Sequence, residues 1–176
     1  MSLTSLIGRK NILTKIYIPR EILVISSCLT AFFMTVFEIG IFFLFMIPVQ
    51  FVPTITLVWF PLLLLFGFVF VLGISFILSV LNARLNDVQH IWTVVLQAGF
   101  FLMPIFYKID IFPPEIQKIL SAFPMVAFLE TSRQVILYNE NPDSEMLMYL
   151  IGISSLVLVI GYAIFRKFES KIIEEL

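Results

Sequence analysis

Long runs of hydrophobic residues, broken by short polar segments, make up most of the chain. The runs cover residues 22–47, 55–81, 91–107 and 146–165. A helix needs roughly 20 mostly apolar residues to cross a hydrocarbon core of about 30 Å. The run at 91–107 is the shortest, and His90 and Lys108 flank it. The pattern predicts an all-α fold, a polytopic membrane helical bundle with about four transmembrane helices.

Two further segments have helical patterns but are too short or too polar to cross a membrane. In residues 2–18 the apolar side chains gather near one helical face and the basic ones lie largely elsewhere, which predicts an amphipathic helix within segment 1–20. In residues 111–137, Pro113 and Pro114 begin a helical stretch that Pro124 interrupts. Short apolar helices of this kind are typical of re-entrant or interfacial elements. We expect residues 1–176 to form a single domain, with the re-entrant helices placed before the last span.

The positions of lysine and arginine predict the orientation in the membrane, because cytoplasmic loops carry an excess of these residues. With a cytoplasmic N-terminus, eight of them lie on the inner side and three on the outer side. The inner residues are Arg9, Lys10, Lys15, Arg20, Arg84, Arg166, Lys167 and Lys171, and the outer ones are Lys108, Lys118 and Arg133. We therefore expect both termini and the loop 82–90 to face the cytoplasm.

Composition agrees with a membrane protein and excludes several kinds of enzyme. Hydrophobic residues make up 60% and charged residues 13% of the chain, and the mean hydropathy is +1.06. No phosphate-binding G-x-x-x-x-G-K-[ST] loop is present, so ATP hydrolysis by that route is excluded. A single histidine, His90, and a single cysteine, Cys28, cannot build a zinc site or a cysteine cluster. We expect no catalytic residue, no metal site, no cofactor and no nucleic-acid partner.

A few charged residues are candidates for a functional role. Glu38 lies inside the first run, where a charge costs a few kcal/mol, so we expect it to face the bundle or a cavity, or to be protonated. It either lines a pore or gate, or is a neutral acid bonded to a neighbouring helix. Glu130 and Arg133 are spaced to meet on one helical face, as a local ion pair or as a gate or headgroup-binding group. Arg84 and Asp87 in the inner loop either cap helices or contact a cytoplasmic partner.

Five short motifs follow one another along nearly the whole chain. They are NILTKIYIPREIL (residues 11–23), LSVLNARLNDV (78–88), MPIFY (103–107), ETSR (130–133) and the stretch from Phe165 to Glu175. Together they resemble the ABC type-2 permeases that export polysaccharide, O-antigen and teichoic acid. The resemblance implies a membrane subunit of the plasma membrane that forms a homodimer, pairs with a separate ABC ATPase and moves a lipid-linked glycan.

The resemblance also implies roles for particular residues. The N-terminal amphipathic segment is expected to act as a coupling helix seated in the ATPase, where ATP is bound, while the broken helices form an outer gate in contact with membrane lipid. Phe112, Phe123 and Phe128 either add aromatic surface near that gate or contact lipid or protein. The coupling residues are Arg9, Lys10, Lys15, Tyr17 and Pro19; the inner-loop residues are Arg84 and Asp87; the outer-gate residues are Pro104, Tyr107, Glu130 and Arg133.

The chain also departs from the family it resembles. Family members usually have six spans, so we expect the N-terminal helix and first two spans to be missing, through an internal start, a fragment or a degraded gene. Asn86 replaces a basic residue and Phe123 an asparagine that are common in the family. The alternatives are an ABC type-2 exporter of drugs or other lipids, and a non-transporting scaffold or inactive permease fragment. An ion-coupled carrier is disfavoured because the spans contain so few charges.

Overall fold

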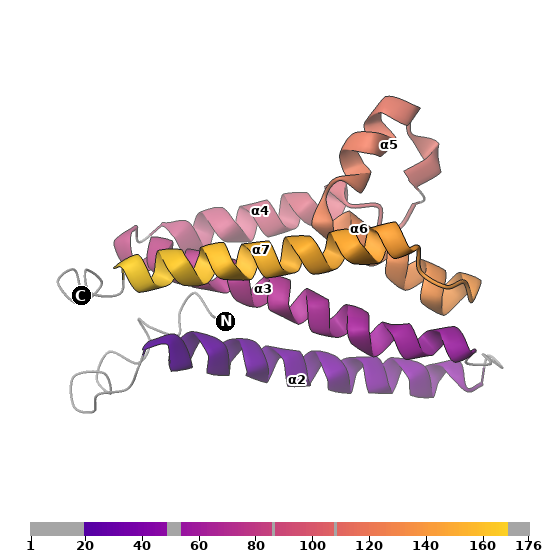
Figure 1. Ribbon diagram of the computed structural model, residues 1–176, viewed down its shortest axis with the longest axis horizontal. Helices are drawn as coiled ribbons and strands as arrows, with labels where there is room; N and C mark the ends of the chain where they lie inside the picture. Colours follow the sequence, from indigo (N-terminus) through magenta and orange to yellow (C-terminus); the bar gives the residue numbers. More distant parts are fainter. Residues whose placement is uncertain (1–19, 49–53, 86, 108, 169–176) are drawn as a thin grey trace. The chain divides into compact units, whose positions relative to one another are not determined.

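The structure is a computed structural model that describes residues 20–48, 54–85, 87–107 and 109–168 of the 176-residue chain. Helices follow one another along this part of the chain (Figure 1), and no strand forms within it. The elements are α2 (Arg20–Met46), η2 (Ile55–Val58), α3 (Trp59–Arg84), α4 (Val88–Leu102), η3 (Ile109–Ile111), α5 (Pro114–Ser121), α6 (Pro124–Arg133), η4 (Gln134–Tyr138) and α7 (Ser144–Phe168). The all-α class predicted from the sequence is confirmed.

Among the residues that the structure describes, three helical stretches are long and apolar enough to cross a membrane. They are Arg20–Met46, Ile55–Arg84 and Ser144–Phe168, and they match the predicted runs 22–47, 55–81 and 146–165. The run 91–107 differs from its prediction, because its helix α4 has 15 residues and ends at Leu102. At 1.5 Å per residue this helix is about 22 Å long, shorter than the hydrocarbon core. Pro104 explains the early end, since proline lacks an N–H and clashes with the preceding turn.

Prolines also determine where α5 and α6 begin. Pro114 is the first residue of α5 and Pro124 the first residue of α6, a position that suits its fixed backbone angle and missing N–H. The predicted break of segment 111–137 into two short helices is therefore present. After Arg133 the chain continues as the π-helical turn η4, which ends at Tyr138, and the next residue, Asn139, has a φ of 54°. The position of these helices relative to a membrane stays a prediction.

One compact unit contains α2, the part of α3 from Phe68 onward and the part of α7 from Ser155 onward. Its core is built from buried side chains of all three helices: Leu23, Val24, Cys28, Phe76, Val80 and Phe165. The rings of Phe76 and Phe165 have their centroids 5.1 Å apart. Most of α2 lies outside this core, and Phe37 is 75% exposed. This apolar surface needs lipid or protein to cover it.

Within the same unit, two glycines bring α3 and α7 into close contact. A Cβ atom added at Gly73 would lie 2.6 Å from the backbone nitrogen of Leu158, and one added at Gly161 would overlap the carbonyl oxygen of Gly73. Only residues without a side chain allow two helix backbones to approach so closely. Small residues at helix contacts are the usual packing device inside membranes, where apolar burial alone gives no driving force.

The second compact unit contains residues 54–67, α4, the short helices α5 and α6, and the part of α7 up to Ser154. Leu63, Ala127, Val135 and Leu150 form its buried core. Two hydrogen bonds tie the ends of its elements together. The Thr56 hydroxyl donates to the Val135 carbonyl at 3.3 Å, and the Tyr149 hydroxyl donates to the Ala122 carbonyl at 2.6 Å. The first bond joins η2 to η4, and the second joins the start of α7 to a residue between α5 and α6.

Candidate functional site at the bent end of helix α4

The segment after α4, residues 103–107, bends without forming a helix. Its amide groups form only short-range bonds: Met103 N donates to the Gly99 carbonyl at 2.8 Å and Ile105 N to the Met103 carbonyl at 2.7 Å. The carbonyl groups of the bend have no helical partners further along the chain. An unpaired carbonyl away from water is costly, so these groups need other donors.

Arg133, the last residue of α6, supplies those donors. Its Nη2 donates to the carbonyl oxygens of Pro104 and Ile105, the latter at 2.6 Å. Its Nη1 donates to the Glu130 carboxylate at 2.7 Å and to the Tyr107 carbonyl at 3.4 Å. The Arg133 side chain is only 16% exposed and that of Glu130 27%, so water reaches them little. One guanidinium therefore replaces the missing helical partners of three carbonyls.

Tyr107 closes the other side of the bend. Its hydroxyl donates to the Leu102 carbonyl at 2.9 Å and lies 3.4 Å from the Phe101 carbonyl. Both carbonyls belong to the last turn of α4. Its ring packs edge-on against Phe112, with centroids 5.5 Å apart. The tyrosine thus acts as a side-chain cap for the end of α4.

The four residues expected at an outer gate, Pro104, Tyr107, Glu130 and Arg133, are therefore brought together in one cluster. The spacing of Glu130 and Arg133 indicated their ion pair, but it did not indicate the carbonyl acceptors. Both terminal nitrogens of Arg133 have two acceptors each, which uses all four of their N–H groups. This cluster is suited to holding the backbone in place. It offers no terminal donor to an anionic ligand, which disfavours a headgroup-binding role for Arg133.

The other candidate residues lie elsewhere. Glu38 is exposed on α2. Its role, as a pore or gate residue or as a neutral acid bonded to a neighbouring helix, stays a prediction. Arg84 ends α3, with its guanidinium 4.2 Å from the centre of the Phe168 ring, and Asp87 lies in the turn before α4. The coupling residues Arg9, Lys10, Lys15, Tyr17 and Pro19 fall outside the described residues. Within the described ranges, no group of three or more acidic, histidine or cysteine side chains could hold a metal ion.

A contact that sequence reasoning missed links the first turn of α2 to α7. The Tyr162 hydroxyl donates to the Glu21 carboxylate at 3.1 Å, and the Arg166 guanidinium lies 6.0 Å from the centre of the Tyr162 ring. Glu21 follows directly after the N-terminal amphipathic segment. The two residues are 141 positions apart, so no local pattern could have indicated the bond.

Comparison with known proteins gives relatives over nearly the whole chain. The O-antigen export system permease protein RfbA of Myxococcus xanthus is 29% identical over 171 residues, covering 96% of this chain and 65% of that protein. Two proteins of the same name from Klebsiella pneumoniae are 25% identical, and each match covers 98% of this chain and 67% of the Klebsiella protein. The chain thus spans about two thirds of the length of these relatives. Residues 4–137 match the family described as ABC-2 type transporter. This match covers most of the chain and includes four of the five motifs, so the chain belongs to the ABC-2 type transporter family.

Proposed function

We propose that this chain is the channel-forming membrane subunit of an ATP-driven ABC exporter for a lipid-linked polysaccharide or related glycan. The observation that carries the proposal is similarity to proteins named as O-antigen export permeases over 96–98% of the chain. The three long apolar helices of the described part of the chain fit a multi-pass subunit. The lysine and arginine pattern supports an orientation with both termini in the cytoplasm, and the family resemblance supports a place in the plasma membrane.

In this proposal the chain supplies the path and a separate ABC ATPase supplies the energy. Two copies of the chain pair with the ATPase, and the basic N-terminal segment seats in it through Arg9, Lys10, Lys15, Tyr17 and Pro19. The bond between Glu21 and Tyr162 supports a route by which movement of that segment reaches α7 as well as α2. Arg84, at the end of α3, and Asp87, in the turn that follows, are expected on the same cytoplasmic side. The chain has no catalytic residue of its own in this scheme.

The cluster around Arg133 fits an outer gate that is stable in one form and needs several bonds broken to open. Pro104 ends the helix, Tyr107 caps it, and Arg133 and Glu130 hold the bend. Because the backbone is irregular there, a change in this segment does not require a helix to unwind. That property suits an element that opens and recloses during transport.

The proposal is tested by affinity co-purification of the tagged chain from its host in mild detergent. Recovery of an ABC ATPase is the expected result, and glycan accumulation on the cytoplasmic side in a deletion strain is expected to follow. Recovery of the chain alone would indicate the scaffold or inactive-fragment alternative. Accumulation of a drug or another lipid in place of a glycan would indicate a different ABC-2 exporter.

Charge reversal of Lys15 tests the coupling segment itself. Lys15→Glu is expected to reduce ATPase recovery severalfold while membrane insertion stays unchanged, because the basic face contacts the partner. Lys118→Glu, the same change on the predicted outer side, is the matched control and should leave ATPase recovery unaffected. Unchanged recovery after reversing both Arg9 and Lys15 would show that the basic face plays no part in docking.

A further inference from the structure

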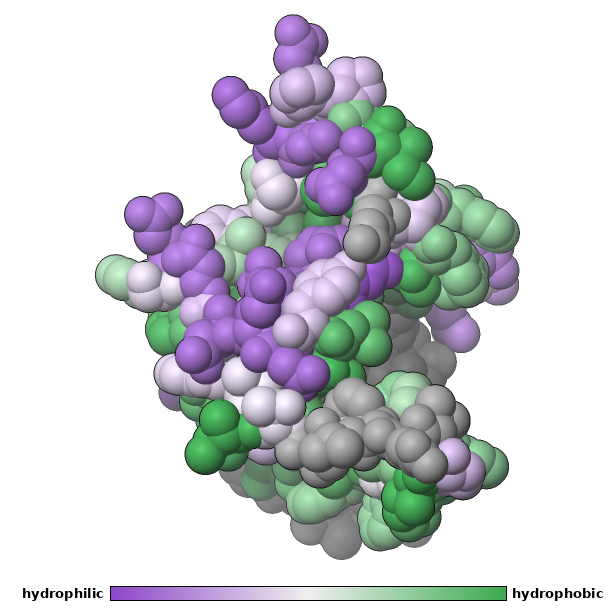
Figure 2. Space-filling model, turned by 90° about the vertical axis from the view of Figure 1, so that its right-hand side faces the viewer, coloured by the Kyte–Doolittle hydropathy of each residue, from purple (hydrophilic) through white to green (hydrophobic). Residues whose placement is uncertain are grey.

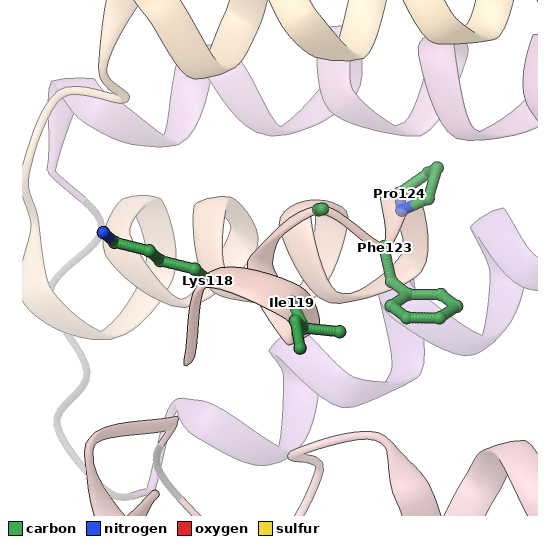
Figure 3. Close-up of a pocket in the computed structure, with 5 residues that line it drawn as sticks. Lys118, Ile119, Phe123 and Pro124 are labelled. Carbon is green, nitrogen blue, oxygen red and sulfur yellow. The ribbon is translucent and has the colours of Figure 1, made fainter. Parts of the chain in front are cut away.

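A hollow lies where α5 passes into α6. It has a volume of about 580 Å³ and is lined by Lys118, Ile119, Ala122, Phe123 and Pro124 (Figure 3). Four of these five residues are apolar. Ile119 is 64% exposed and Phe123 52%, so the lining presents apolar surface that the described chain itself leaves uncovered.

Lys118 gives the hollow one charged end. Figure 3 shows its side chain extended away from the labelled side chains of Ile119 and Phe123. Its ammonium group forms no hydrogen bond or ion pair with any residue in the part of the chain that the structure describes. Glu115 stands one helical turn earlier, yet the two side chains do not pair. Arg133, the other cation of α5 and α6, already has both terminal nitrogens engaged. Of the two cationic side chains in α5 and α6, Lys118 is thus the one that can bind an anion.

The sequence of α5 supports a place at the membrane surface. This helix lies in the connection between α4 and α7, where the chain leaves one apolar helix and enters the next. Figure 2 shows hydrophilic and hydrophobic side chains next to each other around α5, at the top of the view. Such a mixed surface is typical of helices that lie in the interface with their apolar face in the acyl region.

We propose that the hollow binds a membrane phospholipid with an anionic headgroup. The phosphate region lies at the Lys118 ammonium, and an acyl chain covers the apolar surface of Ile119 and Phe123. A cation at one end of an apolar surface matches an amphiphile with a negative head and a hydrocarbon tail. A soluble anion would leave the apolar part uncovered. Lipid binding at this hollow depends on the membrane location and not on export, so it can be tested independently of the proposed function.

Quenching of a tryptophan by brominated lipid tests this site in the full-length chain. Phe123→Trp, with Trp59 and Trp92 changed to phenylalanine, places a single indole in the hollow. The protein is reconstituted into vesicles that contain either brominated phosphatidylglycerol or brominated phosphatidylcholine in unlabelled phosphatidylcholine. We expect half-maximal quenching at an about fivefold lower fraction of phosphatidylglycerol, as one lysine near a lipid surface predicts. The preference should fall at high salt.

Variants of Lys118 decide the outcome. Lys118→Gln is expected to abolish the fivefold preference, while Lys118→Arg keeps the charge and should retain it. Glu115→Gln is the control on the same helix and should leave the preference unchanged or raise it. Equal quenching by the two lipids in the parent, or an unchanged preference in Lys118→Gln, would overturn the proposal. Because no ATPase is present in the vesicles, neither result depends on the exporter function.

Discussion

Replacing Arg133 by glutamine tests whether one guanidinium holds the bend after α4. Arg133 donates to the carbonyls of Pro104, Ile105 and Tyr107 and to the Glu130 carboxylate. Glutamine is shorter and keeps only two N–H donors, so most of these contacts are lost. With a side chain only 16% exposed, water can replace just part of them. We expect the bend to open more often, while the rest of the chain stays folded.

The size of the effect follows from the contacts. Hydrogen bonds that involve a charged group each contribute about 1.5–3 kcal/mol. Three of the Arg133 contacts are short, and the fourth, at 3.4 Å to the Tyr107 carbonyl, adds little. After a discount for partial exposure and for bonds that glutamine restores, we expect a loss of about 3 kcal/mol. That corresponds to a roughly hundredfold rise in the open population.

Cysteine labelling measures that population directly. Ile105→Cys in a Cys28→Ala background places one thiol in the bend, and its rate of reaction with a maleimide reports local opening. The rate should rise about a hundredfold in Arg133→Gln. Arg133→Lys keeps the charge but loses the planar fork, so it should give an intermediate rate. Glu130→Gln leaves the carbonyl contacts in place and should raise the rate about tenfold or less.

Two results would contradict this reasoning. An unchanged rate in Arg133→Gln, with normal membrane insertion, would show that other contacts hold the bend. An equal rise in Glu130→Gln and Arg133→Gln would show that the ion pair matters and the carbonyl contacts do not. Circular dichroism of each variant controls for global unfolding.

Two further predictions concern packing. Gly161→Ala should lower the free energy of unfolding by about 3 kcal/mol, because its Cβ would overlap the Gly73 carbonyl oxygen. Gly152→Ala is the control and should have little effect, because no atom lies within 4 Å of its added Cβ. Equal melting temperatures of the two variants in detergent would refute the close contact of α3 and α7. Tyr149→Phe removes the 2.6 Å hydrogen bond to the Ala122 carbonyl and should destabilise the second unit by about 1 kcal/mol. Thermal melting checks this change, and a melting curve that matches the parent would show that the bond adds no stability.

Features that depend on local chemistry could be predicted from the sequence. The long helices follow from runs of apolar residues with few charges, because length and composition alone make such runs prefer lipid. Pro114 and Pro124 begin short helices because the restrictions of proline act on its own backbone and the preceding turn. The ion pair between Glu130 and Arg133 follows from their spacing on one helix. The five motifs likewise indicated the family, because each of them lies within one short stretch of the chain.

Features that depend on distant contacts could not be predicted from the sequence. Arg133 and Ile105 are 28 positions apart, and the acceptor is a backbone carbonyl, a group that every residue carries. The close approach of Gly73 and Gly161 and the bond between Glu21 and Tyr162 also belong to this class. The amino-acid sequence by itself determined which segments are helices and which prefer lipid. Only the tertiary structure decided how the bend is held, because backbone groups gain partners from whatever folding brings beside them.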